Sequence, residues 1–342
     1  MADERRPPAV ARVLTQVTAT VREHEMFEPR SLVLVAVSGG PDSVCLLYSL
    51  CFLRRLLKVR VEAFHFDHRL RSDSGLDGRY AARLCARLHV PLHLEVATGA
   101  PGEGMSVEAW ATTARLTAAN GVRRATGADV IAEGHTLDDQ AETVLLNVVR
   151  GTGLEGAAGI DPGGPDSALV QPLLGVTREE VEAFCGALHL RPRRDPMNDD
   201  RRFLRAAMRH DVLPVLEEAT GRGVKRSIAR TAATLRGDLG ELVASAEQAS
   251  ARLVDASHPG RIRIEASGLR ALPPSLAARM IRMAAYETLS PDAVAPWSKS
   301  AIEAVLDLAG GRPGRRRDLS DGMTARRDRT HVIVERAPET RG

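Results

Sequence analysis

Apolar and polar positions recur with two different periods along the first half of the chain. Short aliphatic runs typical of buried strands occur in the segments 32–37, 59–68, 91–97 and 128–135. Each run is followed by a stretch with helical periodicity, at about 42–57, 75–88, 106–126 and from 137 onward. Strands and helices in this order favour a parallel sheet covered on both faces. We therefore predict an α/β fold with a doubly wound, mostly parallel sheet.

The second half of the chain follows another pattern. Residues 204–253 are helical in periodicity and rich in arginine, and two further helices are expected near 272–288 and 299–308. Strands are expected only within 322–336. We therefore predict four parts along the chain: a helical or flexible N-terminal segment (1–28), the α/β domain (29–215), a mainly helical domain (216–338) and a disordered tail (339–342).

Three polar clusters follow the predicted strands directly. They are the turn 38–43, the segment 65–71 (HFDHRLR) and the segment 133–139 (EGHTLDD). Ligands bind at the carboxyl ends of the strands in sheets of this kind. We therefore expect the three clusters to form one site.

The turn Ser38-Gly39-Gly40-Pro41-Asp42-Ser43 has the composition of an anion-binding loop. Its glycines permit close backbone approach, its serines supply hydroxyl donors, and a proline suits the first turn of a helix. An ordinary glycine-rich turn would explain the glycines but not the acid and the two serines. The turn is neither a Walker A loop nor a GxGxxG fingerprint. Because Asp42 would repel a phosphate, we predict a phosphate site with Mg²⁺ at Asp42.

An acidic cluster lies at the start of the helix that begins near residue 137. Asp138 and Glu142 stand one helical turn apart, Asp139 lies to the side, and His135 precedes the helix. Such a cluster suits a cation, either Mg²⁺ or the ammonium group of an amino acid. The alternative is a solvated acidic helix start that the helix dipole favours.

A basic stripe is expected beyond residue 200. Arg201, Arg205 and Arg209 fall four residues apart, and Lys225 and Arg226 extend the stripe. Such a stripe could follow a nucleic-acid backbone. It could equally be a solvent-facing surface neutralised by nearby aspartates. The charges alone leave both readings open.

Composition narrows the class of protein further. The chain has 44% hydrophobic and 27% charged residues and a formal charge of +3. No apolar run reaches the roughly 20 residues of a membrane span, and the N-terminal segment MADERRPPAV has no signal-peptide core. We therefore expect a cytoplasmic protein. The four cysteines show no CxxC spacing, so we expect reduced core thiols.

At this point a family resemblance is evident. SGGPDS resembles the pyrophosphate-binding loop of the N-type ATP pyrophosphatases. Together with HFDHRLR, EGHTLDDQAETVLLNVVRGTG and RDPMNDDRRFLRAAMR, it makes the chain similar to the tRNA(Ile)-lysidine synthase family from about residue 30 to 235. The resemblance implies ATP contacts at the whole loop, His65 and His135. It also implies catalytic roles for Asp42, Asp138, Asp139 and Glu142, and tRNA contacts along the basic stripe.

The resemblance further implies a reaction. Free L-lysine would be joined to C2 of the wobble cytidine of a tRNA(Ile) with a CAU anticodon, through an O-adenylated base. The chain departs from the family pattern at Thr112, Leu116 and Ala206, so those positions carry no inherited role. The oligomeric state, monomer or homodimer, stays open. Two alternatives are thiolation of a tRNA base by the same adenylation, and a non-catalytic tRNA-binding protein with a degenerate nucleotide site.

Overall fold

The computed structural model describes residues 6–70, 73–102, 105–193, 201, 204–221, 223–258, 260–289, 297–319 and 322–336. The tail predicted at 339–342 lies outside this part of the chain. Two compact units are present, Met1–Thr234 and Leu235–Gly342, and the division falls within the long helix α10 (Val224–Leu253). The functional boundary that the sequence suggests between residues 215 and 216 lies earlier and stays a prediction.

The first unit is built on a sheet of five strands in the order β3-β2-β1-β4-β5. Every neighbouring pair is parallel, and Val33 of β1 pairs with Val61 of β2 and with Val130 of β4. The prediction of a parallel α/β sheet is thereby confirmed. The strands are β1 (Leu32–Ala36), β2 (Arg60–Asp67), β3 (Leu92–Val96), β4 (Val130–Ala132) and β5 (Leu169–Val170).

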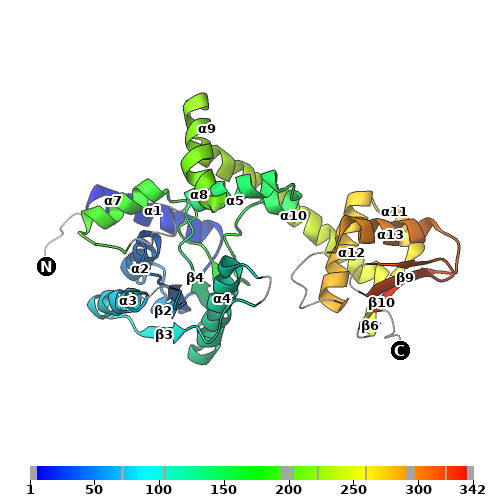
Figure 1. Ribbon diagram of the computed structural model, residues 1–342, viewed down its shortest axis with the longest axis horizontal. Helices are drawn as coiled ribbons and strands as arrows, with labels where there is room; N and C mark the ends of the chain where they lie inside the picture. The colour runs from blue at the N-terminus through cyan, green and yellow to red at the C-terminus, as the bar shows by residue number, and fades with distance from the viewer. Residues whose placement is uncertain are drawn as a thin grey trace. The chain divides into compact units, whose positions relative to one another are not determined.

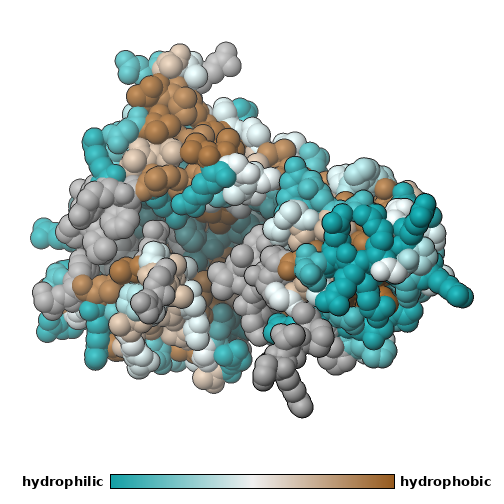
Figure 2. Space-filling model, turned by 45° about the vertical axis from the view of Figure 1, so that its right-hand side comes forward, coloured by the Kyte–Doolittle hydropathy of each residue, from teal (hydrophilic) through white to brown (hydrophobic). Residues whose placement is uncertain are grey.

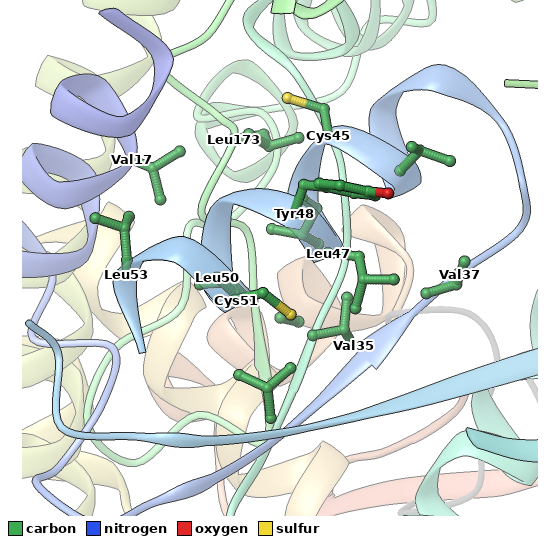
Figure 3. Packing of buried hydrophobic residues seen from close by; sticks show 14 of the residues in the cluster. Val17, Val35, Val37, Cys45, Leu47, Tyr48, Leu50, Cys51, Leu53 and Leu173 are labelled. Atoms are coloured by element: carbon green, nitrogen blue, oxygen red, sulfur yellow. The ribbon is translucent and has the colours of Figure 1, made fainter. Parts of the chain in front are cut away.

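Helices cover both faces of this sheet (Figure 1). On one face, alternate strand residues such as Val33 and Val35 pack in a core with residues of four helices, α1 (Pro8–Glu23), α2 (Pro41–Leu53), α3 (Gly75–Leu88) and α7 (Arg178–Ala187). Figure 3 shows part of this core, in which Leu47 and Leu50 of α2 lie between Val35 and Val17 of α1. On the other face, intervening residues such as Leu34 pack against α4 (Val107–Thr126).

The remaining helices of the first unit lie beyond the carboxyl end of β4. They are α5 (Leu137–Val149), α6 (Leu154–Ala157), α8 (Leu204–Ala207), the π-helical turn η2 (Met208–Val212) and α9 (Leu213–Thr220). Figure 2 shows apolar surface at the top of the view, over α9. Exposed aliphatic residues on these helices are Val148, Val149, Leu204, Val212 and Val215. This surface therefore offers aliphatic as well as charged contacts to a partner.

The second unit is mainly helical, as predicted, and also contains a sheet. Five antiparallel strands run in the order β6-β7-β10-β9-β8 and pack against the helices through buried residues such as Ile262 and Val332. Besides α10, the elements are β6 (Val254–His258), β7 (Arg261–Glu265), α11 (Ala266–Ala271), α12 (Pro274–Leu289), α13 (Lys299–Gly310), β8 (Arg316–Asp318), β9 (Met323–Arg327) and β10 (His331–Arg336). The sequence predicted the last two strands, β9 and β10, and missed β6, β7 and β8.

The structure also bears on membrane-spanning helices and on the four cysteines. Among the described residues, no helix combines the length and apolarity that a bilayer span requires. Cys45, Cys51, Cys85 and Cys185 are all buried and unpaired. Burial raises the pKa of Cys51 and Cys85 to about 11 and that of Cys185 to about 12. They are therefore core thiols with little thiolate at neutral pH.

Candidate active site

The turn after β1 is folded around the hydroxyl of Ser43. Ser43 Oγ accepts a hydrogen bond from the Gly39 amide at 3.2 Å and donates one to the Gly40 carbonyl at 3.0 Å. Gly39 has φ of +96°, a conformation that suits glycine. Gly40 is the N-cap of α2 and Pro41 its first residue, so the loop ends at a helix N-terminus. Ser38 and Ser43 are within hydrogen-bond distance at 3.1 Å. This is the geometry of an anion-binding loop.

Asp42 lies in the first turn of α2 and lacks a close cation. Its Oδ1 is buried and has no hydrogen-bond partner among the residues that the structure describes. Arg178 Nη2 is 3.8 Å from Oδ2. Burial raises the pKa of Asp42 to about 6, against the opposing effect of Arg178. An orphaned carboxylate oxygen beside an anion-binding loop fits one ligand position of Mg²⁺, which commonly uses one or two carboxylates together with substrate phosphates.

Gly134, just after β4, allows the loop to sit against the sheet edge. A Cβ at this position would lie 3.1 Å from the Asp42 carbonyl carbon and 3.3 Å from the Ser43 nitrogen. Both are backbone atoms of the loop and cannot rotate away. The close approach therefore requires a residue without a side chain.

Gly134→Ala should displace the loop and weaken nucleotide binding. We expect the free energy of unfolding to fall by about 1–3 kcal/mol, the usual effect of overpacking. We also expect ATP affinity, measured by equilibrium dialysis, to fall at least severalfold. Gly121→Ala is the matched control, because nothing lies within 4 Å of a Cβ there and the position is inside α4. Equal effects of the two substitutions would contradict the packing argument.

The acidic helix α5 begins with a capping box in which Asp139 hydrogen-bonds to Thr136. Its Oδ2 accepts hydrogen bonds from the amide and the hydroxyl of Thr136, at 2.8 and 2.7 Å. Its Oδ1 is 3.6 Å from both Arg178 Nη2 and Arg209 Nη2. Burial raises the pKa of Asp139, but Arg178, Arg205 and the Thr136 amide outweigh it and the net pKa is lowered. Asp139 is therefore a permanently ionised centre of this helix start.

Glu142 is fully buried and shares two arginines with Asp139. Arg209 binds both of its oxygens, at 2.6 and 2.8 Å, and Arg205 Nε donates to Oε2 at 3.2 Å. The bidentate contact holds the π-helical turn η2 against α5. Two residues predicted to contact tRNA thus face the acidic helix in this structure.

Asp138 is held by one backbone group and one side chain. Its Oδ2 accepts a hydrogen bond from the Arg178 amide at 2.8 Å. Its Oδ1 accepts one from the Lys225 ammonium at 2.6 Å. The carboxylate therefore carries an ammonium group on Oδ1, and both residues line the cleft described below.

Arg178 is a site residue that sequence reasoning missed. It opens α7 directly after Thr177, which forms a capping box with Glu180. Its guanidinium approaches both Asp42 and Asp139, and its Nε is buried without a partner among the described residues. The guanidinium therefore joins the loop to the acidic helix and can meet a bound phosphate. Only its position one residue after a helix cap marked it in the sequence.

Glu133, the first residue of the predicted cluster 133–139, pairs with Arg115 of α4 at the end of β4. Arg115 Nη1 donates to Glu133 Oε1, and the Glu133 side chain is 7% exposed. The predicted nucleotide contact His135 lies beside them, with Nδ1 3.0 Å from Gln171 Oε1. Burial lowers the pKa of His135. The sheet edge therefore places a carboxylate, a guanidinium and an imidazole together.

His65, the other predicted nucleotide contact, is a buried strand residue. Its Nδ1 is 2.7 Å from the Val37 carbonyl oxygen, so this nitrogen carries the proton. Its Nε2 is buried without a partner among the described residues. His65 therefore supports the chain immediately before the loop, and direct contact with a nucleotide stays a prediction.

The three polar clusters meet in one cleft of about 1240 Å³. Residues from all three line it, including the loop, Asp67, His68, Glu133, His135, Asp138 and Asp139. No group of three or more His, Cys, Asp or Glu side chains suited to a metal occurs in the described ranges.

The other predicted residues lie around the cleft. Arg201 is exposed and pairs with Asp211 at 2.8 Å, and Arg226 pairs with Glu180 at 3.4 Å. Of the three positions that depart from the family pattern, Thr112 is exposed, Leu116 is half-buried and Ala206 is buried. The assignment of the basic residues to RNA stays a prediction.

The parallel sheet, the loop after its first strand and the carboxylates at its edge define a PP-loop nucleotide-binding domain, and the family model described as "PP-loop domain" matches residues 10–216. Within that class the chain belongs to the tRNA(Ile)-lysidine synthase family. It is 34% identical to the tRNA(Ile)-lysidine synthase of Thermobifida fusca over 91% of this chain and 96% of the relative. It is 39% identical to that of Leifsonia xyli over 75% of this chain and 76% of the relative.

Some relatives are considerably longer. The tRNA(Ile)-lysidine synthase of Symbiobacterium thermophilum is 36% identical over 91% of this chain, which spans 66% of that protein's length. Among solved structures, a U34-tRNA thiolase from Methanococcus maripaludis is similar with a TM-score of 0.57 and 20% identity, covering 66% of this chain and 79% of that one. This second likeness is one of fold alone.

Proposed function

We propose that the protein joins free lysine to C2 of the wobble cytidine in a CAU-anticodon tRNA(Ile), using ATP. The observation that carries this proposal is the composition of the cleft. An anion-binding loop with an orphaned carboxylate oxygen lies in the same cleft as a carboxylate that holds an ammonium group. Adenylation needs the first feature, and attack by an amine needs the second.

In the first step the loop would hold the ATP phosphates. Mg²⁺ at Asp42 would offset charge on the phosphates and on the departing pyrophosphate. The cytosine O2 attacks the α-phosphorus, pyrophosphate leaves, and AMP remains on O2. Arg178 lies where it can neutralise charge between Asp42 and Asp139. AMP then serves as the leaving group at C2.

In the second step the lysine amine attacks C2 and AMP leaves. The free amine has a pKa of about 10.4, so it enters as an ammonium and must lose a proton. A carboxylate in the cleft can hold the ammonium and accept that proton. Asp138 is suited to this because its oxygen already carries an ammonium. Glu142 is a positioning residue, because both of its oxygens bind arginines.

The tRNA would bind through the exposed cations around the cleft. Arg201 and Arg226 are 67% and 54% exposed, and each forms an ion pair within the described residues that a phosphate can replace. The wobble base must leave its stack to reach the cleft, which costs a few kcal/mol and less in a loop than in a duplex. Thiolation of a base would need a reactive thiol, and the buried cysteines with raised pKa values do not favour it.

Lowering the pH should inhibit the adenylation step by protonating Asp42. Arg178 should influence the pH at which this inhibition begins. Because Asp42 must be ionised to hold a cation, kcat/KM for ATP–pyrophosphate exchange should fall as the pH drops through about 6. Burial sets this raised pKa, and Arg178 is the first of the charges that oppose it. Arg178→Met should therefore move the acidic limb of the profile of kcat/KM against pH to higher pH. Arg12→Met, at another cleft residue, should leave the limb in place. An unmoved limb in Arg178→Met would reject Asp42 as the titrating group.

The reaction is tested by incorporation of radiolabelled lysine into a CAU-anticodon tRNA(Ile) transcript with ATP and Mg²⁺. A transcript with uridine at position 34 is the control. Label on the first transcript alone supports both the reaction and the modified base. AMP transfer without lysine would retain adenylation and reject the nucleophile. Neither product would favour a non-catalytic tRNA-binding protein.

A further inference from the structure

Lys225 places a primary ammonium inside the cleft. The chain has only three lysines, Lys58, Lys225 and Lys299. Lys225 lines the cleft, and its Nζ lies 2.6 Å from Asp138 Oδ1. The proposed substrate is an amino acid whose side chain ends in the same group. The protein thus holds, at its own carboxylate, the chemical group that the reaction requires.

Asp138 is prearranged to bind such a group. The Arg178 amide fixes Oδ2, and the side chain is only 9% exposed. This leaves Oδ1 as an acceptor with a defined direction. A carboxylate so fixed and shielded binds an ammonium through a strong, charge-assisted hydrogen bond.

Four other acidic residues, two of them on α5 like Asp138, are less suited to an amine. Glu142 is saturated by two arginines, and Glu133 is paired with Arg115. Asp139 uses one oxygen for its capping box and directs the other toward guanidinium groups. Asp42 lies in the phosphate-binding loop. Asp138, which already holds the Lys225 ammonium, is therefore better suited to an amine than these four carboxylates.

Apart from this one hydrogen bond, little holds the Lys225 ammonium in place. Asp138 is the only acceptor within hydrogen-bond distance of its ammonium among the described residues, although an ammonium has three donors. The side chain is 36% exposed. Lys225 also lies in the first turn of α10, where the helix dipole disfavours a cation. The contact therefore depends on Asp138, and a competing amine can replace it.

We propose that Asp138 is the amine-binding subsite and that the Lys225 ammonium fills it until the ammonium of the amino-acid substrate displaces it. This inference rests on the proposed function. Lys225 neutralises Asp138 while the site is empty and competes with the substrate. The apparent affinity for lysine is lowered by the fraction of time that Asp138 is occupied. No covalent step involves Lys225.

Removing the competing charge should strengthen lysine binding. Lys225→Met keeps the length of the side chain without the ammonium. If Lys225 occupies Asp138 nine-tenths of the time or longer, KM for lysine in the tRNA assay should fall about tenfold or more in this variant. Lys225→Arg retains a cation and should give a KM within about threefold of the wild type. Lys299→Met is the matched control on an exposed helix start, where KM should not change.

An unchanged or raised KM for lysine in Lys225→Met would overturn the proposal. A raised KM would mean that Lys225 helps to bind substrate, whether lysine or tRNA, rather than competing. KM for tRNA, measured in the same assay, should stay within about twofold of the wild type, and a large rise would assign Lys225 to RNA instead.

A second readout does not depend on catalysis. With ¹⁵N-labelled lysine in the protein, only three side-chain ammonium signals arise, and the Lys225 variant assigns one of them. Adding unlabelled L-lysine should shift the Lys225 signal and leave the other two unchanged. A static Lys225 signal would overturn the proposal even if the enzyme is active. A shifted signal in a protein that incorporates no lysine would retain the amine subsite and reject the proposed function.

Discussion

Asp42→Asn should abolish AMP transfer while making the folded protein more stable. The neutral amide cannot hold Mg²⁺ in the way that a carboxylate does. Loss of this charge stabilisation, worth several kcal/mol, should reduce adenylation by about a thousandfold. Transfer of labelled AMP from ATP to tRNA measures this directly. Affinity for tRNA should change by no more than a few-fold.

The gain in stability follows from the raised pKa of Asp42. The folded state binds its proton up to a pH of about 6, against about 3.8 for the ordinary carboxyl. The contribution of this group to stability is therefore fully present below the lower value and lost as the pH rises through the higher one. At pH 7.5 ionised Asp42 destabilises the fold by about 3 kcal/mol, and asparagine removes that penalty.

Urea unfolding at pH 5 and pH 7.5 checks this sign. The advantage of Asp42→Asn should be larger at pH 7.5. Asp166→Asn, at an exposed turn, should change neither stability nor AMP transfer. A destabilised Asp42→Asn protein would mean that the carboxylate is compensated in the folded state. Retained adenylation would reject Asp42 as a metal-binding residue.

Glu142→Gln should unfold more readily than the wild type by about 3 kcal/mol. Removing one partner of a buried ion pair leaves charge without compensation, and such losses are typically 3–5 kcal/mol. Glutamine keeps the shape of the side chain and one acceptor oxygen. We therefore expect a loss at the lower end of this range. Arg205 and Arg209 would then turn toward Asp139, already 4.0 and 3.6 Å from them. AMP transfer should therefore fall as well.

Asp211→Asn provides the matched control for this substitution. It breaks the pair with Arg201, whose side chain is 67% exposed, so the loss should not exceed about 1 kcal/mol. Urea unfolding of both variants measures the difference. Similar losses would mean that the Glu142 network contributes no more than a surface ion pair.

Much of the nucleotide-binding half was predictable because its signals are local. The loop and the acidic helix start each lie within a few residues of sequence, where backbone preference and side-chain chemistry act together. The strand order could place these motifs at one edge, since parallel strands end on the same side. The sequence therefore predicted that these motifs form one site, although it did not identify all the residues that line the cleft.

The parts that escaped prediction depend on contacts between distant segments. Arg178 donates to Asp138 across 40 residues, and Lys225 to the same carboxylate across 87. No local pattern specifies such pairs. The basic stripe shows the same limit, since its spacing gave no sign that Arg205 and Arg209 would bind Glu142. By contrast, β7 did carry a signal, the alternation of Arg261–Glu265 (RIRIE), which was overlooked.

The buried cysteines have a practical consequence for experiments on this protein. Thiol reagents attack the thiolate, and burial keeps all four native sulfurs both inaccessible and protonated at neutral pH. A cysteine introduced at an exposed position would therefore react selectively without prior removal of the native ones. A single fluorophore or spin label could then be attached to either compact unit, so that tRNA binding can be followed by spectroscopy on an otherwise unaltered chain.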